Sequence, residues 1–145
     1  MSNVARGIHL AAIWLFAACS VIQVFLAGLG VFVGPDRFAL HRDFGYMFGL
    51  LLLVVIVAAV AGRLGRRQIL YAVALMILFT LQSVLIAFRE TAPEVAALHP
   101  VNGFLIIAVA FVAGREALAA WRARRAQPVP AAGSAIEEPG VSAAG

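Results

Sequence analysis

The chain has little charge, almost no cysteine and no lysine. Only 12% of its 145 residues are charged, about half the fraction that soluble domains carry. Cys19 is the single cysteine, which excludes an internal disulfide and a Cys-x-x-Cys redox pair. With 63% hydrophobic residues and a mean hydropathy of +0.99, the composition predicts one small integral membrane domain in a lipid bilayer.

Four apolar runs are long enough to cross a bilayer, which takes about 20 helical residues. They lie at Ile8–Val33, Phe38–Ala61, Ile69–Phe88 and Val101–Ala120. The sequence therefore predicts an all-α fold, an up-down-up-down bundle of four transmembrane helices over residues 1–125. Residues 126–145 are rich in Pro, Ala, Gly and Ser, which predicts a disordered cytoplasmic tail. Between the last two spans, the capping-box spacing of Thr91 and Glu94 predicts a short interfacial helix over Ala92–Leu98.

The arginines divide unequally between the two sides of this bundle. Eight lie on the side of both termini: Arg6, Arg63, Arg66, Arg67, Arg115, Arg122, Arg124 and Arg125. Three lie on the other side: Arg37, Arg42 and Arg89. The positive-inside rule then predicts a multi-pass protein of the inner (plasma) membrane with both termini in the cytoplasm. We interpret the net charge of +4 as this orientation signal and expect no binding to nucleic acid.

A short motif indicates an internal repeat. Ala-Leu-His occurs at Ala39–His41 and again at Ala97–His99, and a glycine follows each histidine by four residues, at Gly45 and Gly103. A glutamine lies 18 residues before the first histidine and 17 before the second (Gln23 and Gln82). The period is 58 residues, so two two-helix repeats build the bundle. Because spans two and four are diagonal in such a bundle, the two histidines should face each other at one depth, as a paired binding site.

Two facing histidines suit one cofactor in particular. A closed zinc site takes four protein ligands, and Asp43, Glu90 and Glu94 at the same end offer extra ligands, which leaves a zinc or copper site open. Haem needs only its two axial positions filled by the protein. We therefore predict a bis-histidine haem b site with His41 and His99 as metal ligands. The glycines on the histidine face would leave room for a flat ring, and arginines at the same level would pair with its propionates. These predicted contacts are Gly45, Gly49, Gly103, Arg37, Arg42 and Arg89.

Each of these residues also has an interpretation without a cofactor. The histidines can be interfacial, the glycines can allow close helix packing, and the arginines can anchor to headgroups. We interpret Gln23 and Gln82 as hydrogen-bonding across helix interfaces. His9 has no counterpart in the repeat, so we interpret it as interfacial. Pro100 disfavours helical geometry at the preceding residue, which predicts that His99 is an N-cap or hinge residue.

The segment Leu40–Gly49 resembles the His-Arg-x-x-Gly segment of haem A synthase, with His41 on that motif. The four-helix halves of that family hold haem between histidines of their second and fourth helices, as four-helix cytochrome b bundles also do. The resemblance implies haem binding; the glutamate before the synthase's catalytic histidine is absent here. Residues 1–125 also resemble a family of small, uncharacterised four-span bacterial membrane proteins. The resemblance rests on features that occur in the same order: the glutamine, the Leu-His pair and the segment Leu98–Gly103.

These observations leave three function classes open. We favour a haem-binding membrane protein that transfers electrons or handles haem, with a redox partner in the membrane. The first alternative is a cofactor-free accessory or interaction subunit, whose histidines hydrogen-bond Asn102 and the glutamines. The second is a small transporter, with Gln23, Gln82 and the histidines lining a polar path. No nucleophile–base set indicates an enzyme, and no motif decides whether the chain forms a homodimer.

Overall fold

The computed structural model describes residues 2–126, and the predicted tail lies outside them. These residues form helices and turns without a strand. In chain order the elements are α1 (Ser2–Phe32), the 3-10 turn η1 (Pro35–Arg37), α2 (Phe38–Gly49), α3 (Leu51–Ala61), α4 (Arg66–Ala87), α5 (Pro93–Ala96) and α6 (Leu98–Arg125).

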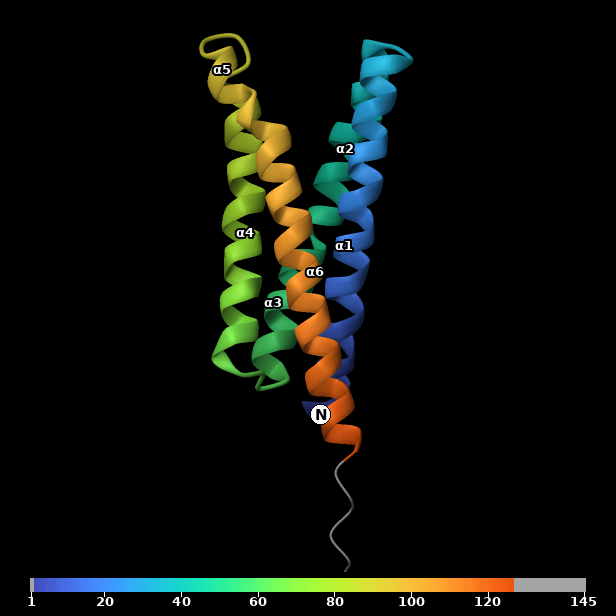
Figure 1. Cartoon of the computed structure of the whole chain (residues 1–145), viewed down its shortest axis with the longest axis vertical. Coiled ribbons are helices and arrows are strands. Elements are labelled where there is room, and N and C mark those ends of the chain that lie inside the picture. Colours follow the sequence, from blue (N-terminus) through green and yellow to red (C-terminus); the bar gives the residue numbers. More distant parts are fainter. Residues whose placement is uncertain (1, 127–145) are drawn as a thin grey trace, which may run out of the picture.

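The helices form the predicted four-helix up-down bundle (Figure 1). Helices α2 and α3 follow each other along one span, so the spans are α1, α2–α3, α4 and α6. Helix α1 packs against α2, α3 and α6, and α4 packs against α3 and α6. The span α2–α3 is therefore diagonal to α6, and α1 is diagonal to α4, as an up-down bundle requires.

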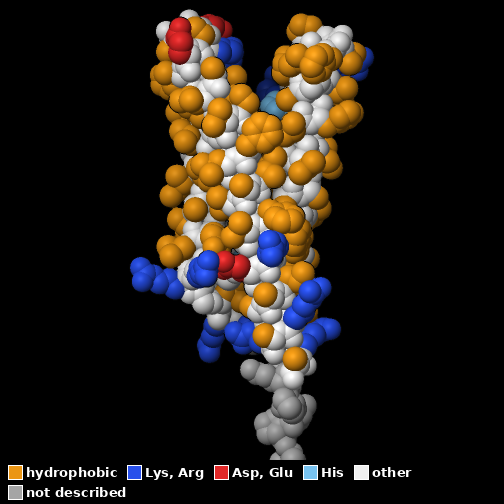
Figure 2. All heavy atoms as spheres, viewed as in Figure 1, with side chains coloured by type: hydrophobic (Ala, Val, Ile, Leu, Met, Phe, Trp, Pro, Cys, Tyr) orange, Lys and Arg blue, Asp and Glu red, His pale blue; other side chains and the backbone are white. Residues whose placement is uncertain are grey.

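All four spans are long and apolar enough to cross a membrane. Large hydrophobic side chains such as Phe25, Leu53, Ile77 and Phe111 are exposed on the outside of the bundle. Figure 2 shows hydrophobic atoms along its whole length, with arginines gathered toward one end. An apolar exterior of this kind is suited to lipid and not to water. The chain is a multi-pass membrane protein.

The two ends of the bundle differ in packing. At the end that holds the N-terminus and the last turn of α6, the terminal end, the four spans stay together. At the other end, the open end, the pair α1–α2 diverges from α4–α6, and the space-filling view shows a notch between the two arms (Figures 1 and 2). The largest fully buried core side chains are Phe16, Ile13, Leu52, Leu75 and Val55. These five side chains belong to one hydrophobic core cluster, in which residues of all four spans pack together.

The helix ends depart from the predicted spans. Helix α1 begins at Ser2 and α6 ends at Arg125, so both helices extend beyond the predicted apolar runs. The second span continues from α2 into α3 through Leu50, whose backbone is still helical (φ −61°, ψ −23°), and forms one span of 27 residues.

The short helix predicted before the last span is present as α5, but its N-cap is Ala92 and no side chain caps it, so the capping box of Thr91 and Glu94 is not formed. Pro100 lies in the first turn of α6, where a missing N–H is tolerated. His99 is thus a helical residue in the first turn of α6, and its prediction as an N-cap or hinge residue was wrong, since the N-cap is Ala97.

Candidate functional site

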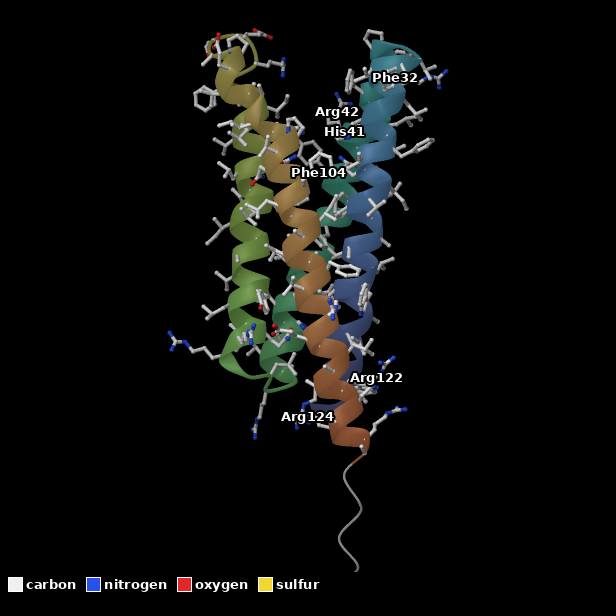
Figure 3. All side chains as sticks on the ribbon, viewed as in Figure 1. Phe32, His41, Arg42, Phe104, Arg122 and Arg124 are labelled. Atoms are coloured by element: carbon white, nitrogen blue, oxygen red, sulfur yellow. The ribbon has the colours of Figure 1, made fainter. Side chains whose placement is uncertain are left out.

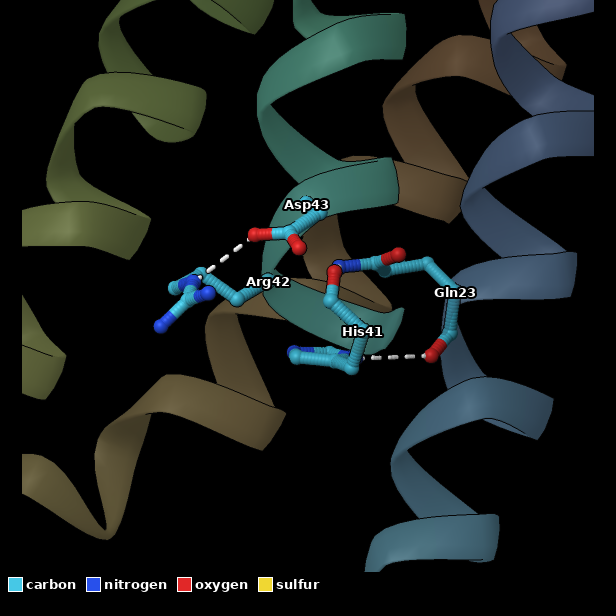
Figure 4. A network of polar contacts seen from close by, with 4 residues as sticks. All are labelled: Gln23, His41, Arg42 and Asp43. Atoms are coloured by element: carbon cyan, nitrogen blue, oxygen red, sulfur yellow. Dashed lines mark hydrogen bonds and ion pairs between the residues drawn. The ribbon is translucent and has the colours of Figure 1, made fainter. Parts of the chain in front are cut away.

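Gln23 and His41 form a closed hydrogen-bonded unit between α1 and α2. The Gln23 side-chain Nε2 donates to the His41 backbone carbonyl at 2.7 Å. In return, the His41 Nδ1 lies 3.0 Å from the Gln23 backbone carbonyl (Figure 4). The two bonds fix the imidazole ring against α1. In Figure 3, His41 lies near the base of the notch between the arms, with Arg42 beside it.

Gln82 and His99 form the same unit between α4 and α6. The Gln82 Nε2 donates to the His99 carbonyl at 2.9 Å, and the His99 Nδ1 lies 3.0 Å from the Gln82 carbonyl. The same pairs of atoms are joined as in the first unit. The internal repeat read from the motif is therefore present in the structure, and both glutamines bond across a helix interface as interpreted.

These bonds determine the tautomer of both histidines. A backbone carbonyl can only accept, so each Nδ1 carries the proton and donates it. Each Nε2 then keeps its lone pair. Within residues 2–126, neither His41 nor His99 has a hydrogen bond from Nε2. Metal-binding histidines are typically held in this way, with one ring N–H on a carbonyl and the other nitrogen free to bind.

The two rings approach each other across the diagonal of the bundle. Their centroids are 6.1 Å apart, with an angle of 62° between the ring planes. Each Nδ1 faces a different neighbouring helix, α1 or α4, and Figure 4 shows the other nitrogen of His41 directed away from Gln23. An imidazole nitrogen binds a metal ion at about 2.0 Å and lies about 1 Å from its ring centre, so two rings on opposite sides of one ion have centroids about 6 Å apart.

The glycines near the histidines have protein neighbours. A Cβ on Gly45 would lie 2.7 Å from the Gln23 Nε2, and one on Gly103 would lie 3.3 Å from the Gln82 Nε2. A Cβ on Gly49 would lie 2.5 Å from the ring of Phe79. The room that these glycines leave is thus taken by two amides and a phenyl ring. These contacts agree with the alternative interpretation, in which the glycines allow close helix packing.

The three arginines at the open end pair with their neighbours in sequence. Arg37 pairs with Asp36 at 3.3 Å, Arg42 with Asp43 at 2.8 Å (Figure 4), and Arg89 with Glu90 at 3.1 Å. All six side chains are at least half exposed. Exposed pairs of this kind are weak, so a competing carboxylate could replace the acidic partner at little cost.

One position distinguishes the two units. In the second unit, the Asn102 side-chain Nδ2 donates to the Gln82 Oε1 and to the Leu78 carbonyl at 2.9 Å. The residue 58 positions earlier is Phe44, which has no group to donate. Among residues 2–126, the buried Gln23 Oε1 accordingly has no hydrogen-bond partner. The sequence pattern singled out Asn102 only as a hydrogen-bond partner for the histidines.

His9 lies inside the bundle, so its interpretation as an interfacial residue was wrong. It is 2% exposed, its Nδ1 lies 3.0 Å from the Val55 carbonyl, and its Nε2 lies 3.3 Å from the Gln68 Oε1. His9 also has a counterpart: Gln68 follows it by 59 residues (68 − 9), the same spacing as from Gln23 to Gln82 (82 − 23). Applying the glutamine spacing to α1 and α4 would have found it.

Comparison with known proteins matches part of the chain to a protein family. Residues 23–91 are similar to a family of unknown function (DUF6220). The matched segment contains Gln23, His41 and Gln82 and ends before His99. No curated protein and no solved structure matches the chain, and the resemblance to haem A synthase and cytochrome b bundles has no counterpart in these comparisons.

Proposed function

We propose that this chain is a b-type haem-binding membrane protein in which His41 and His99 are the two axial ligands. The observation that carries the proposal is the ring spacing of 6.1 Å between two imidazoles whose Nδ1 atoms are both tied to carbonyls. Both Nε2 lone pairs are then available to one metal ion between the rings.

The donor set favours haem over a bare ion. Within residues 2–126, no group of three or more His, Cys, Asp or Glu side chains comes together, and a closed zinc site takes four ligands. The porphyrin of haem supplies four nitrogen ligands, so the protein needs to supply only two. When bound, it would supply one-electron redox chemistry. Ligation on both sides of the iron suits electron transfer or haem handling more than oxygen chemistry.

The remaining predicted contacts have supporting roles in this proposal. Arg37, Arg42 and Arg89 would exchange their neighbouring carboxylates for propionates. Gly45 and Gly103 act through the glutamines: they admit the amides that hold the histidine backbones. A redox partner in the membrane would donate or accept the electron.

A visible absorption spectrum of the purified full chain, expressed with ample haem, tests the proposal. Bis-histidine ligation predicts a six-coordinate, low-spin iron. His41→Ala and His99→Ala should each abolish the low-spin spectrum, and added imidazole should restore it. His9→Gln removes a histidine at the terminal end and should leave the band positions unchanged. A wild-type protein without haem absorption would refute the proposal.

We propose further that both termini face the cytoplasm, which would direct the open end outward. Arg122 and Arg124 are at the terminal end (Figure 3), together with six of the other arginines that the positive-inside rule counts. Reporter fusions after Gly65 should report the cytoplasm, and a fusion after Val95 should report the outside. The reverse pattern would overturn the orientation and leave the haem proposal standing.

The cofactor-free accessory subunit remains the second candidate, and a specific observation favours it. The histidine Nδ1 atoms, the glutamine amides and Asn102 already satisfy one another, and protein atoms fill the space beside the glycines. In this case the two units only hold neighbouring helices together by hydrogen bonds. Replacing His41 or His99 would then lower the free energy of unfolding without any change in the visible spectrum.

A further inference from the structure

A pocket opens at the terminal end of the bundle, between α1, α4 and α6. Arg6 and His9 of α1, Gln68 of α4, and Trp121 and Arg124 of α6 line it, together with apolar side chains. The indole ring packs on α1, where a Cβ at Gly7 would lie 3.5 Å from it. Tryptophan is enriched at the level of lipid headgroups, so Trp121 indicates that the pocket lies at headgroup depth.

The two arginines of the pocket have no acidic partner within residues 2–126. The Arg6 Nε donates to the Gly62 backbone carbonyl at 2.8 Å, and its Nη1 donates to the Asn3 side chain at 3.2 Å. These bonds fix the guanidinium and leave further N–H donors unused. Ion pairs in the described chain involve neither Arg6 nor Arg124. Both groups are therefore available to an anion.

The two ends of the bundle differ in their supply of carboxylates. Each of the three arginines at the open end pairs with an adjacent acidic residue. Among residues 2–126, the terminal end has eight arginines and one acidic residue, Glu116, which pairs with Arg67 at 2.6 Å. Figure 2 shows the arginines gathered at this end. The positive charge of the pocket is thus left without a counter-charge from the described chain.

A buried amide in the pocket also has an unused polar group. Gln68 is 8% exposed, and one end of its amide lies 3.3 Å from the His9 Nε2. The other end has no hydrogen-bond partner within residues 2–126. Because buried polar groups are normally satisfied, this amide indicates that a polar group from outside the described chain enters the pocket.

We propose that this pocket binds the phosphate of an anionic phospholipid headgroup. The guanidinium groups of Arg6 and Arg124 pair with the phosphate oxygens, and the unused end of the Gln68 amide bonds the headgroup. Trp121 lies against the start of the acyl chains. Basic pockets between transmembrane helices bind anionic headgroups in this way. The site is separate from the histidine pair and does not depend on haem.

Quenching of Trp121 fluorescence by brominated phospholipids tests the proposal on the purified full chain. Trp14→Phe leaves Trp121 as the single tryptophan, and this variant is reconstituted into phosphatidylcholine bilayers. Brominated phosphatidylglycerol should quench to saturation at a small fraction of the lipid. Arg6→Gln and Arg124→Gln should each lower its affinity about fivefold. Quenching by brominated phosphatidylglycerol that is no stronger than quenching by brominated phosphatidylcholine would refute the site.

Arg122→Gln is the matched control, because Arg122 carries the same charge on the same helix (Figure 3) and does not line the pocket. It should change the affinity less than about twofold, and a loss equal to that of Arg124→Gln would overturn the proposal. Arg124 is exposed and donates no hydrogen bond to the rest of residues 2–126, so this comparison stands even if Arg6→Gln does not fold.

Inorganic phosphate separates a lipid headgroup from a free anion. Millimolar inorganic phosphate, added to the protein in the same bilayers, should not reverse the quenching by brominated phosphatidylglycerol, because the acyl chains hold the lipid beside Trp121. Reversal that is lost in Arg124→Gln would show that the pocket takes the free anion and would overturn the assignment to a lipid.

Discussion

Equivalent residues of the repeat meet at both ends of the bundle, with different outcomes. At the open end His41 on α2 faces His99 on α6, and each ring uses only Nδ1 for a hydrogen bond. At the terminal end His9 on α1 meets Gln68 on α4, and both nitrogens of His9 are engaged. The second pair is closed, and both of its members are buried.

The difference separates a structural polar pair from one that is available to a ligand. A buried polar group is normally satisfied by a partner, and His9 meets that requirement within the bundle. The histidines at the open end keep two lone pairs and lie where the arms diverge (Figure 1). The repeat therefore provides a buried, hydrogen-bonded pair at the terminal end and a candidate binding pair at the open end.

The largest expected effect comes from breaking each pair in turn. His9→Ala should lower the free energy of unfolding by about 3 kcal/mol, because it leaves a cavity and an unpaired Gln68. The haem spectrum of the remaining folded protein should not change. His41→Ala and His99→Ala should do the opposite, with the low-spin spectrum lost and stability changed less. Denaturation in detergent and visible spectra measure the two effects, and a His9→Ala protein with lost haem and full stability would contradict the comparison.

A substitution can also give the pair of His41 and His99 the same side chains as the pair of His9 and Gln68. His99→Gln places an amide opposite His41, as Gln68 stands opposite His9. We expect the low-spin spectrum to disappear while stability stays within about 1 kcal/mol of the wild type, since one hydrogen bond is exchanged for another. His99→Ala is the matched control, because it removes the ligand without supplying an amide. Low-spin haem retained in His99→Gln would show that residue 99 is not a ligand.

Much of the fold could be predicted because hydropathy and the arginine distribution are properties of whole spans and do not depend on single contacts. The four spans, their antiparallel order and the diagonal placement of α2 and α6 follow from run length and short connections. The close approach of Gly49 to the ring of Phe79 on α4 could not be predicted in this way. It is a contact between distant parts of the chain, which hydropathy does not specify.

The candidate site was predictable to the extent that it repeats. The motif placed His41 opposite His99, and the observed ring spacing agrees with that placement. His9 has no histidine counterpart in the repeat, and its partner Gln68 follows it by 59 residues, whereas the period of the Ala-Leu-His motif is 58. The partners of Gly45 and Gly103 depend on side-chain directions across two interfaces, which one sequence does not specify.

A smaller effect is expected from filling the space beside the glutamines. Gly45→Ala brings a Cβ to 2.7 Å from the Gln23 Nε2, so the amide must move and its bond to the His41 carbonyl breaks. We expect a loss of about 1–2 kcal/mol. Gly103→Ala, the matched control, meets the Gln82 Nε2 at 3.3 Å and should cost less than half as much. Equal losses in thermal unfolding would show that the two units are equally rigid.

The smallest expected effect concerns an ion pair at the terminal end. Arg67 lies 2.6 Å from Glu116, and the Tyr71 hydroxyl donates to the same carboxylate at 3.0 Å. Because the Arg67 side chain is 73% exposed, water and salt screen the pair. Glu116→Gln should lower the unfolding midpoint less than Gly103→Ala does, and high salt should erase the difference from wild type. Tyr71→Phe separates the hydroxyl's contribution, which salt should not erase. If Glu116→Gln lowered the unfolding midpoint strongly even in high salt, the contacts of Glu116, and not the pair of His9 and Gln68, would be the main stabilising interaction at the terminal end.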